Sequence, residues 1–448
     1  MDSSNVLSEE HTVRHLIVLS LENRSFDHIF ARRFNPDRAL WTTPPLQVAV
    51  DPPHQFVDVQ AQLRGEWSAP WKGAAPSPTA DLRRFAYTPA QLPIITALAD
   101  HFVLFDRWFS AVPGPTWPNR YFMHAGTSGG LVLSPDPTDV PALLRGNRYD
   151  WAGALGYEFR NGTVFDALDR VGATWRIYTG DWLPQTISLH GMPAKYVFAK
   201  LHGGTAFRRF EHLSGDLAKP DFPNYAFIEP HWDFKHDYLY GNSEHPIGNI
   251  AEGEALLKRL YEAVRNSRYW DTCAILVLYD EHGGFFDHVP PGTTVPTGDD
   301  ERYASPEHPF DFRRLGFRVP AILISPRVER GLVDSTHYDH SAVPLLLAEL
   351  FGIPRLTPRV AHQPSLARLF DGKIRDDTPR ELPQVFRDRA ALMQSRRPEP
   401  DRGALSLAML VDSALGSCIE PSHCRALRSP VVAARYVEDV RARLQART

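Results

Sequence analysis

The chain has 448 residues, of which 43% are hydrophobic and 23% are charged, and these values are typical of a soluble globular protein. Its formal net charge of −4 and isoelectric point near 6.6 argue against a nucleic acid as a partner. No run of about 18 apolar residues occurs, which argues against a membrane-spanning helix. The N-terminus starts with acidic residues and lacks a signal-peptide pattern, so we expect a cytoplasmic protein or one exported by a signal-independent route.

Three short apolar runs end abruptly in polar residues, at 15–23, 273–282 and 319–327. Unbroken apolar runs of this length are typical of strands buried on both faces in a parallel sheet. These three segments therefore predict buried strands of a parallel sheet.

Helical patterns lie between and after these strands. Residues 163–181 predict a helix, a glycine stop and a strand, and residues 251–267 and 339–354 predict two further helices. Asp339 or Ser341 is a suitable cap for the last of them. Strands that alternate with helices predict an α/β fold, a three-layer α/β/α sandwich with a mostly parallel central sheet.

Composition divides the chain into a body at 12–371 and an extension at 372–448. The body contains a Pro-rich excursion at about 44–93, and the extension is charged and interrupted by proline. Its final segment, "VVAARYVEDVRARLQA", predicts an amphipathic helix with acids as well as arginines on the polar face. This mixture favours docking onto the body or a sister subunit, while peripheral membrane contact stays open.

The three cysteines give little information on redox environment. Cys273 lies in a predicted strand, where a buried free thiol is expected. Cys418 and Cys424 are close enough for a local disulfide, and the sequence leaves their pairing open.

Two of the predicted strands end in polar pairs, Glu22-Asn23 and Asp280-Glu281. Ligands of open α/β sheets bind beyond the carboxyl ends of the strands, so neighbouring strands would bring these side chains together. Three carboxylates at one place repel one another unless a cation compensates them. Oxygen ligands of this kind suit Ca²⁺, Mg²⁺, Mn²⁺ or Zn²⁺.

The segment "SAVPGPTWPNRYF" predicts a turn followed by a helix that starts near Thr116. A threonine hydroxyl at a helix start lies among free backbone N–H groups, which bind phosphate or sulfate. Thr116 could therefore act as a nucleophile or simply cap the helix.

Several blocks of the chain resemble one family. They are "LENRSFDHIF", "FDRWFSAVPGPTWPNRYF", "NSEHPIGNIAEGEALLKRLYEAV", "YDEHGGFFDHVPP" and "RVPAILISPRVERGLV", in this order over about residues 12 to 370. The chain resembles the phosphoesterase family of non-specific and phosphatidylcholine-type phospholipases C and acid phosphatases, within the alkaline phosphatase-like superfamily. The resemblance implies that 12–371 is the catalytic domain.

The resemblance also implies roles for individual residues. One divalent metal ion would be bound by Glu22, Asn23, Thr116, Asp280 and Glu281. Thr116 would be the nucleophile, and His245 would contact the phosphoryl group or protonate the leaving oxygen. Substrate contacts are expected from the remaining candidates, which are His54, Asn119, Asp181 and His288.

The expected activity is a phospholipase C that hydrolyses the glycerol-side phosphodiester bond of glycerophospholipids through a phospho-threonine at Thr116. The alternative is an acid phosphatase acting on soluble phosphomonoesters, because the same centre can cleave either ester. Trp108, Phe109, Trp117 and the aromatic segment 229–241 could line a groove for diacylglycerol, which would favour the phospholipase. A sulfatase is excluded because threonine cannot give a formylglycine aldehyde. A non-catalytic binding module would leave a gap among the ligand positions, and none is seen.

Overall fold

The computed structural model describes residues 13–34, 41–48, 51–67, 85–134, 156–233, 238–299, 301–371, 373–386, 408, 411 and 430–446. Cys418 and Cys424 lie outside the described residues. Within this part of the chain, eight strands form one sheet in the order β5-β4-β6-β1-β7-β8-β2-β9. The strands are β1 (His15–Leu21), β2 (Val103–Phe105), β4 (Trp175–Thr179), β5 (Phe207–Arg209), β6 (Tyr225–Glu229), β7 (Cys273–Tyr279), β8 (Ala321–Ile324) and β9 (Val333–Asp334). A small second sheet pairs β3 (Trp108–Phe109) with β10 (Tyr338–Asp339).

The sheet is mostly parallel, as predicted. Strands β5, β4, β6, β1 and β7 pair in parallel, and β1 and β7 are fully buried except for the partly buried His15. The expectation that 319–327 forms a parallel strand is wrong, because β8 runs antiparallel to both β7 and β2. An unbroken apolar run shows that a strand is buried on both faces, but it carries no information on the direction of the strand.

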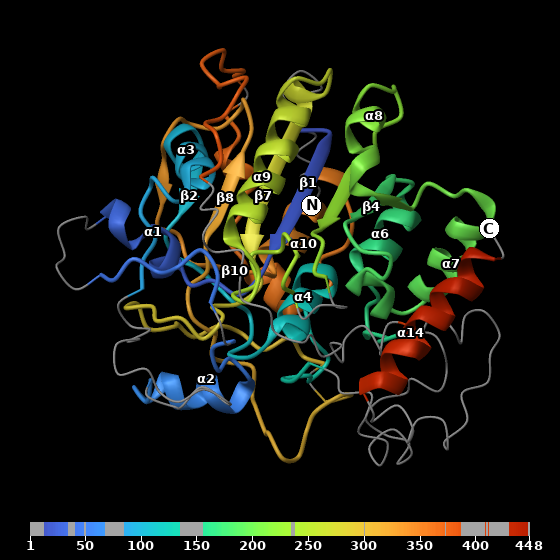
Figure 1. Ribbon diagram of the computed structural model, residues 1–448, viewed down its shortest axis with the longest axis horizontal. Helices are drawn as coiled ribbons and strands as arrows, with labels where there is room; N and C mark the ends of the chain where they lie inside the picture. Colours follow the sequence, from blue (N-terminus) through green and yellow to red (C-terminus); the bar gives the residue numbers. More distant parts are fainter. Residues whose placement is uncertain are drawn as a thin grey trace, which may run out of the picture.

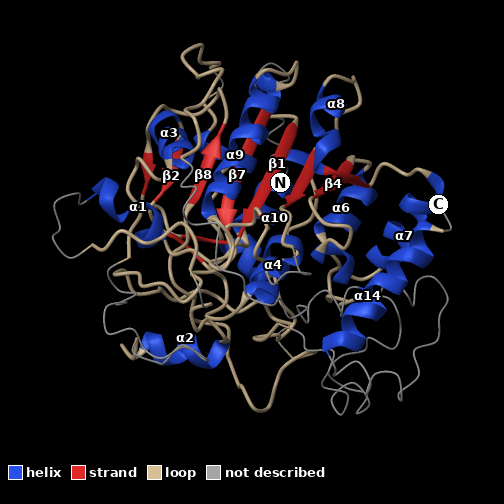
Figure 2. Ribbon diagram, in the orientation of Figure 1, coloured by secondary structure: helices blue, strands red, loops and turns tan. Residues whose placement is uncertain are grey.

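Helices cover both faces of the sheet (Figures 1 and 2). Helices α3 (Pro93–His101), α8 (Leu213–Leu217) and α9 (Ile250–Arg265) pack together on one side, with α9 in front of the sheet in Figure 1. On the other side α4 (Thr116–Ala125), α6 (Val164–Val171) and α10 (Ala342–Phe351) pack together. The predicted three-layer α/β/α sandwich is confirmed.

Five further helices complete the described part of the chain. They are α1 (Phe26–Phe34), α2 (Phe56–Leu63), α7 (Met192–His202), α11 (Pro358–His362) and α14 (Pro430–Gln445), with short 3-10 turns at Gln185–Ser188, Phe210–His212, Trp270–Thr272 and Ala367–Leu369. Helix α2 lies in the predicted Pro-rich excursion.

Local sequence explains where the predicted helices start and stop. The Thr163 hydroxyl accepts a hydrogen bond from the Asp166 N–H, and Gly172 ends α6 in the left-handed conformation (φ 73°). The Asn249 side chain caps α9 by accepting from the Ala251 N–H. At α10 the N-cap residue is Ser341, and the Asp339 carboxylate accepts from its backbone N–H at 2.7 Å.

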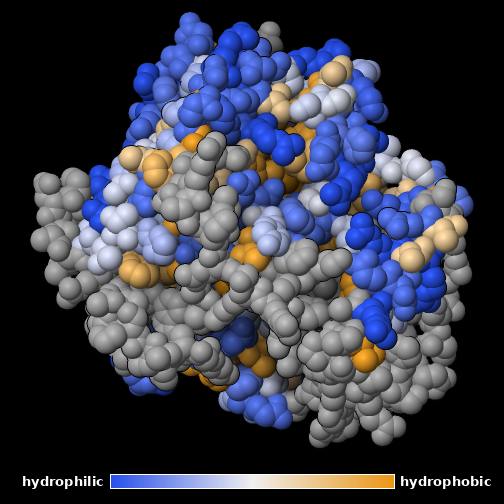
Figure 3. Space-filling view, in the orientation of Figure 1, coloured by the Kyte–Doolittle hydropathy of each residue, from blue (hydrophilic) through white to orange (hydrophobic). Residues whose placement is uncertain are grey.

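The C-terminal helix α14 docks onto the body, as its amphipathic pattern predicts. It lies beside α7 in Figure 1, and Tyr436, Val440 and Leu444 are buried in the main hydrophobic cluster. The division of the chain at residue 371 remains a prediction. In the described residues, no helix has the length and apolarity needed to cross a membrane. The described surface seen in Figure 3 is largely hydrophilic, with apolar residues in small separate areas.

Candidate active site

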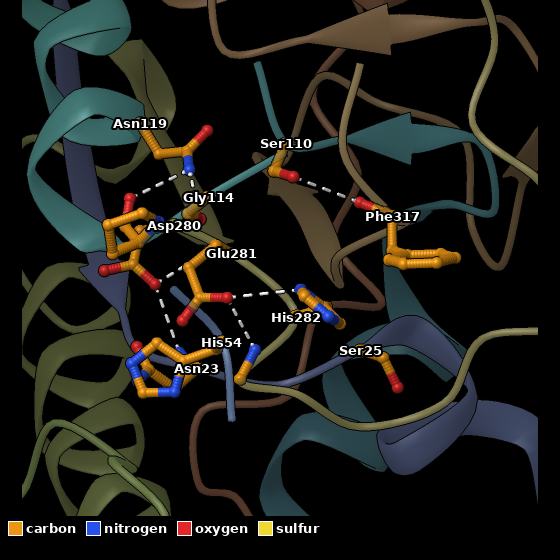
Figure 4. Close-up of polar contacts among 12 residues, drawn as sticks. Asn23, Ser25, His54, Ser110, Gly114, Asn119, Asp280, Glu281, His282 and Phe317 are labelled. Atoms are coloured by element: carbon orange, nitrogen blue, oxygen red, sulfur yellow. Dashed lines mark hydrogen bonds and ion pairs between the residues drawn. The ribbon is translucent and has the colours of Figure 1, made fainter. Parts of the chain in front are cut away.

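The register of β1 and β7 brings the two predicted pairs together. The strands are parallel neighbours with Leu21 opposite Tyr279, so Glu22-Asn23 and Asp280-Glu281 leave the sheet side by side. The Asn23 N–H donates to Asp280 Oδ1 at 3.1 Å, and the Arg24 N–H donates to the Glu281 carbonyl at 3.0 Å. Figure 4 shows Asn23, Asp280 and Glu281 at this point. All four predicted ligand residues of the two pairs are buried.

The Gly283-Gly284 pair allows the chain to turn tightly behind these carboxylates. Both glycines have positive φ, +65° and +74°. A Cβ on Gly283 would overlap the Asn23 carbonyl oxygen and lie 2.5 Å from the carbonyl carbon. Asn23 itself has φ 58°, a left-handed conformation that is uncommon outside glycine and is concentrated at functional sites.

Thr116 is the first residue of α4 and points toward the paired strand ends. Its hydroxyl donates to Asn23 Oδ1 at 3.4 Å, which places the predicted nucleophile beside a predicted metal ligand. The preceding turn is held by Asn119, whose amide nitrogen donates to the carbonyls of Val112, Gly114 and Pro115. Figure 4 shows the Asn119 side chain beside Gly114. Asn119 is fully buried and positions the turn that carries Thr116; its expected contact with substrate stays a prediction.

Arg120, one turn into α4, belongs to the site although no role was predicted for it. Its buried guanidinium donates from Nε to Asp280 Oδ2 at 3.2 Å and lies 3.9 Å from Glu22 Oε1. The Trp232 ring covers its other face, 4.4 Å from the guanidinium carbon. The "PNR" of the motif was visible in the sequence, but only the fold shows which carboxylates the arginine meets.

The charge of the site favours a bound cation. Burial and the neighbouring Glu281 raise the pKa of Asp280 to about 6, even though Arg120 acts in the opposite direction. Glu281 Oε2 accepts from the Gly283 N–H at 2.8 Å, whereas the buried Oε1 has no hydrogen-bond partner among the described residues. An orphaned carboxylate oxygen among clustered acids fits a divalent ion, so the predicted ligand set is chemically suitable.

Two predicted histidines face the same region. His54 Nδ1 donates to the Pro52 carbonyl at 2.7 Å, and its Nε2 lies 3.5 Å from Asn23 Nδ2. The His245 ring stacks on Tyr238, with centroids 3.8 Å apart, and lies 6.5 Å from the His54 ring. Asp51, which was not predicted, lies 3.7 Å from a ring nitrogen of each histidine.

These two histidines have opposite pKa shifts. Burial lowers the pKa of His54, but the carboxylates of Asp51, Glu281 and Asp280 and the Pro52 carbonyl outweigh it and raise the pKa to about 9. Burial, with His54 and Arg24 nearby, holds the pKa of His245 well below its usual value.

The other two predicted substrate contacts, Asp181 and His288, bond to residues outside the predicted ligand set. Asp181 accepts from the Trp232 N–H at 2.5 Å and pairs with His231 at 3.4 Å, and burial raises its pKa to about 6. The side chain of His288 is 55% exposed, and its Nδ1 lies 2.7 Å from Asp27 Oδ2. Their expected contacts with substrate stay predictions.

Asp27, Asp287 and His288 offer ligand atoms within 4.8 Å of one another and form a possible second cation site. Arg318 already lies against both acids, with Nε 2.8 Å from Asp287 Oδ1 and Nη2 3.0 Å from Asp27 Oδ1. We therefore interpret this group as a buried ion-pair network with one exposed imidazole.

The aromatic residues expected to line an apolar groove are part of the core. Trp108, Phe109, Trp117 and Trp232 are all buried, and the Trp108 indole N–H donates to His340. Among the described aromatic residues of 229–241, Tyr238 is partly buried and Tyr240 has 64% of its surface exposed. The diacylglycerol groove expected from these aromatic residues stays a prediction.

Comparison with known proteins identifies the family. The model of the Phosphoesterase family matches residues 33–354. Non-specific phospholipase C3 of Arabidopsis thaliana is 30% identical, with 98% of this chain and 90% of that protein covered. Phospholipase C A of Mycobacterium tuberculosis is 27% identical, with 82% and 76% covered. Among solved structures, the phosphonate monoester hydrolase of Agrobacterium radiobacter has a TM-score of 0.39 at 13% identity, over 81% of this chain and 78% of that one. With a family match over most of its length and these relatives, the chain belongs to the Phosphoesterase family and is a hydrolase of phosphoester bonds.

Proposed function

We propose that this protein is a metal-dependent phospholipase C that cleaves the glycerol-side phosphodiester bond of glycerophospholipids. The observation that carries the proposal is the position of the Thr116 hydroxyl, at the start of α4 and 3.4 Å from Asn23 Oδ1 within a cluster of buried carboxylates. Phosphoesterase and alkaline phosphatase-like proteins generally use divalent metals, and the relatives named phospholipase C favour a lipid diester.

The proposed reaction starts with attack by Thr116 Oγ1 on phosphorus. A divalent cation held by Glu22, Asn23, Asp280 and Glu281 would lower the pKa of this hydroxyl and offset charge on the phosphoryl group. The hydroxyl loses its proton to solvent, the Oγ1–P bond forms and the bond between phosphorus and the glycerol oxygen breaks. The positive end of the α4 dipole would favour negative charge on the phosphoryl oxygens, although the Trp117 N–H already donates to Ser134 Oγ at 3.4 Å and Pro118 has no N–H.

His245 provides the proton for the leaving group in this scheme. Its imidazole is neutral in the free protein, but an anionic phosphodiester bound beside it favours the protonated form. The imidazolium gives its proton to the glycerol oxygen, which leaves as diacylglycerol. Water then attacks the phospho-threonine and returns a proton to His245, the P–Oγ1 bond breaks, and Thr116 regains its proton from solvent.

The test compares three substrates: bis(4-nitrophenyl) phosphate, 4-nitrophenyl phosphate and phosphatidylcholine vesicles. Each is assayed with the protein as purified, after chelation, and after single metals are added back. Release of phosphocholine and diacylglycerol from vesicles supports the proposal. Cleavage of the monoester alone would instead establish the phosphatase alternative.

Two substitutions examine the nucleophile directly. Thr116→Ala removes the attacking oxygen and should reduce turnover by at least about 10³-fold with an unchanged circular dichroism spectrum. Thr116→Ser keeps a hydroxyl and serves as the matched control, with measurable turnover. Residual activity of more than a few per cent in Thr116→Ala contradicts the assignment.

A further inference from the structure

His340 connects the small sheet of β3 and β10 to the predicted metal ligands. It directly follows β10, and the pairing of β10 with β3 places it beside Trp108. Its Nδ1 accepts a hydrogen bond from the Trp108 indole N–H at 3.1 Å, and its Nε2 lies 2.6 Å from the Asp280 carbonyl oxygen. All three residues are fully buried, so bulk water cannot replace either contact.

The two partners determine which ring nitrogen of His340 carries the proton. An indole N–H can only donate, so Nδ1 must be the acceptor. A carbonyl oxygen can only accept, so Nε2 must carry the hydrogen. Both contacts therefore select the same neutral tautomer, and a rotation of the ring would break both hydrogen bonds.

The Asp280 carbonyl bonds to His340 because the parallel ladder ends at this residue. Continued by one residue, the register of β1 and β7 would bring the Asn23 N–H to the Asp280 carbonyl. Instead, the Asp280 carboxylate accepts this N–H through Oδ1 at 3.1 Å. His340 thus supplies to the buried carbonyl the donor that the ladder no longer provides.

This contact fixes the peptide group between the two acidic ligands of β7. The peptide bond is planar, so the Asp280 carbonyl and the Glu281 N–H move as one rigid unit. The Glu281 N–H donates to Asp280 Oδ1 at 2.7 Å. A rotation of the unit away from His340 would turn this N–H away from Oδ1 and change the direction of the Asp280 carboxylate.

We propose that His340 is a positioning residue of the metal site and that the Trp108 indole N–H keeps its ring in place. The pair holds the backbone between Asp280 and Glu281 in the conformation that binds a divalent ion. This inference rests on the proposed function, which assigns the two acids as ligands. Residues that support metal ligands from behind commonly change metal affinity by about 10–100-fold.

The experiment measures the binding of divalent ions to metal-free protein. Equilibrium dialysis with elemental analysis gives dissociation constants for Ca²⁺, Mg²⁺, Mn²⁺ and Zn²⁺, and loss of binding in Asp280→Asn identifies the ion held at this site. His340→Leu removes both contacts, whereas the amide of His340→Gln can accept from Trp108 and donate to the carbonyl. Trp108→Phe keeps an aromatic ring and removes only the N–H donor.

Trp270→Phe is the matched control. Trp270 is buried in the 3-10 turn that precedes β7, at the opposite end of the strand from Asp280. Its indole N–H has no hydrogen-bond partner in the described part of the chain, so this substitution changes packing alone. Urea unfolding of every variant measures the loss of stability separately from ion binding.

The expected result is a loss of ion affinity that follows the hydrogen bonds. His340→Leu should weaken binding by about 10–100-fold, and Trp108→Phe by about three- to tenfold, because the ring then keeps one of its two bonds. His340→Gln should bind within about threefold of wild type, and Trp270→Phe should bind as wild type does. Loss of stability in His340→Leu and Trp108→Phe with wild-type dissociation constants would show that the two residues serve the core alone, and this outcome overturns the inference.

A second measurement examines the ring directly. Histidine-selective ¹⁵N labelling with long-range ¹H–¹⁵N correlation distinguishes the two neutral tautomers in metal-free protein, and His340→Gln assigns the signal. The Nε2–H form is expected, and the Nδ1–H form would overturn the inference while the proposed function stands. Wild-type protein that binds none of the four ions would contradict the proposed function itself, and the role of His340 would fall with it.

Discussion

Gly283→Ala is expected to damage the site and the fold together. Gly283 has φ +65°, where an L-residue with a side chain is disfavoured by about 1–2 kcal/mol. The added Cβ would also overlap the Asn23 carbonyl oxygen and approach Asn23 Cβ to 2.8 Å. Asn23 must therefore move, although it is fully buried and its N–H donates to Asp280 Oδ1.

The cost of this movement can be worked out from the contacts. Loss of the charged hydrogen bond between the Asn23 N–H and Asp280 corresponds to about 1.5–3 kcal/mol. With the backbone term, the free energy of unfolding should fall by about 2.5–5 kcal/mol. Because Asn23 and Asp280 are both candidate ligands, bound metal should fall as well.

Gly172→Ala provides the matched control for backbone strain. Gly172 has φ +73°, and a Cβ there meets nothing within 4 Å, so this variant carries only the backbone term of about 1–2 kcal/mol. Urea unfolding and metal analysis of both variants separate the effect of backbone strain from the effect of the clash with Asn23. Equal losses of stability within about 0.5 kcal/mol, with wild-type metal content in Gly283→Ala, would refute the reasoning.

Three other predictions follow from the described contacts. Asp280→Asn should lose metal and activity together, measured by elemental analysis and steady-state kinetics, and unchanged metal content would contradict the ligand assignment. Hydrogen bonding to Asp27 raises the pKa of His288, so its contribution to stability is fully present below pH 6.5 and is lost as the pH rises through the folded-state pKa. His288→Gln should therefore be less stable than wild type at pH 5.5, by under about 1 kcal/mol because the ring is largely exposed. At pH 9 the two proteins should be equally stable. A constant difference in the free energy of unfolding between pH 5.5 and pH 9 would argue against this role of His288. Leu444→Ala should lose about 2 kcal/mol of stability with an unchanged kcat on a soluble substrate, and a selective loss of activity would show that α14 acts on the site.

Local patterns in the sequence were sufficient for the elements and for much of the site. The buried runs at β1 and β7 depend on burial of a strand on both faces, and the glycine stop of α6 depends on the backbone conformation of Gly172 alone. The polar pairs at the two strand ends could be predicted to converge, because parallel neighbours bring their carboxyl ends to one edge.

Features that depend on contacts between residues far apart in the chain were decided by the tertiary structure. The antiparallel direction of β8, the contact of Arg120 with Asp280 over 160 positions and the burial of Trp108 in the core have no local signal. Asp51 belongs to a Pro-rich stretch whose path has no periodicity, and only the fold sets it between His54 and His245. The spacing of hydrophobic residues predicts which side of a helix or strand is buried. The residues that lie against that side are decided by the packing of the whole chain. The electrostatic properties of the site arise from these distant residues.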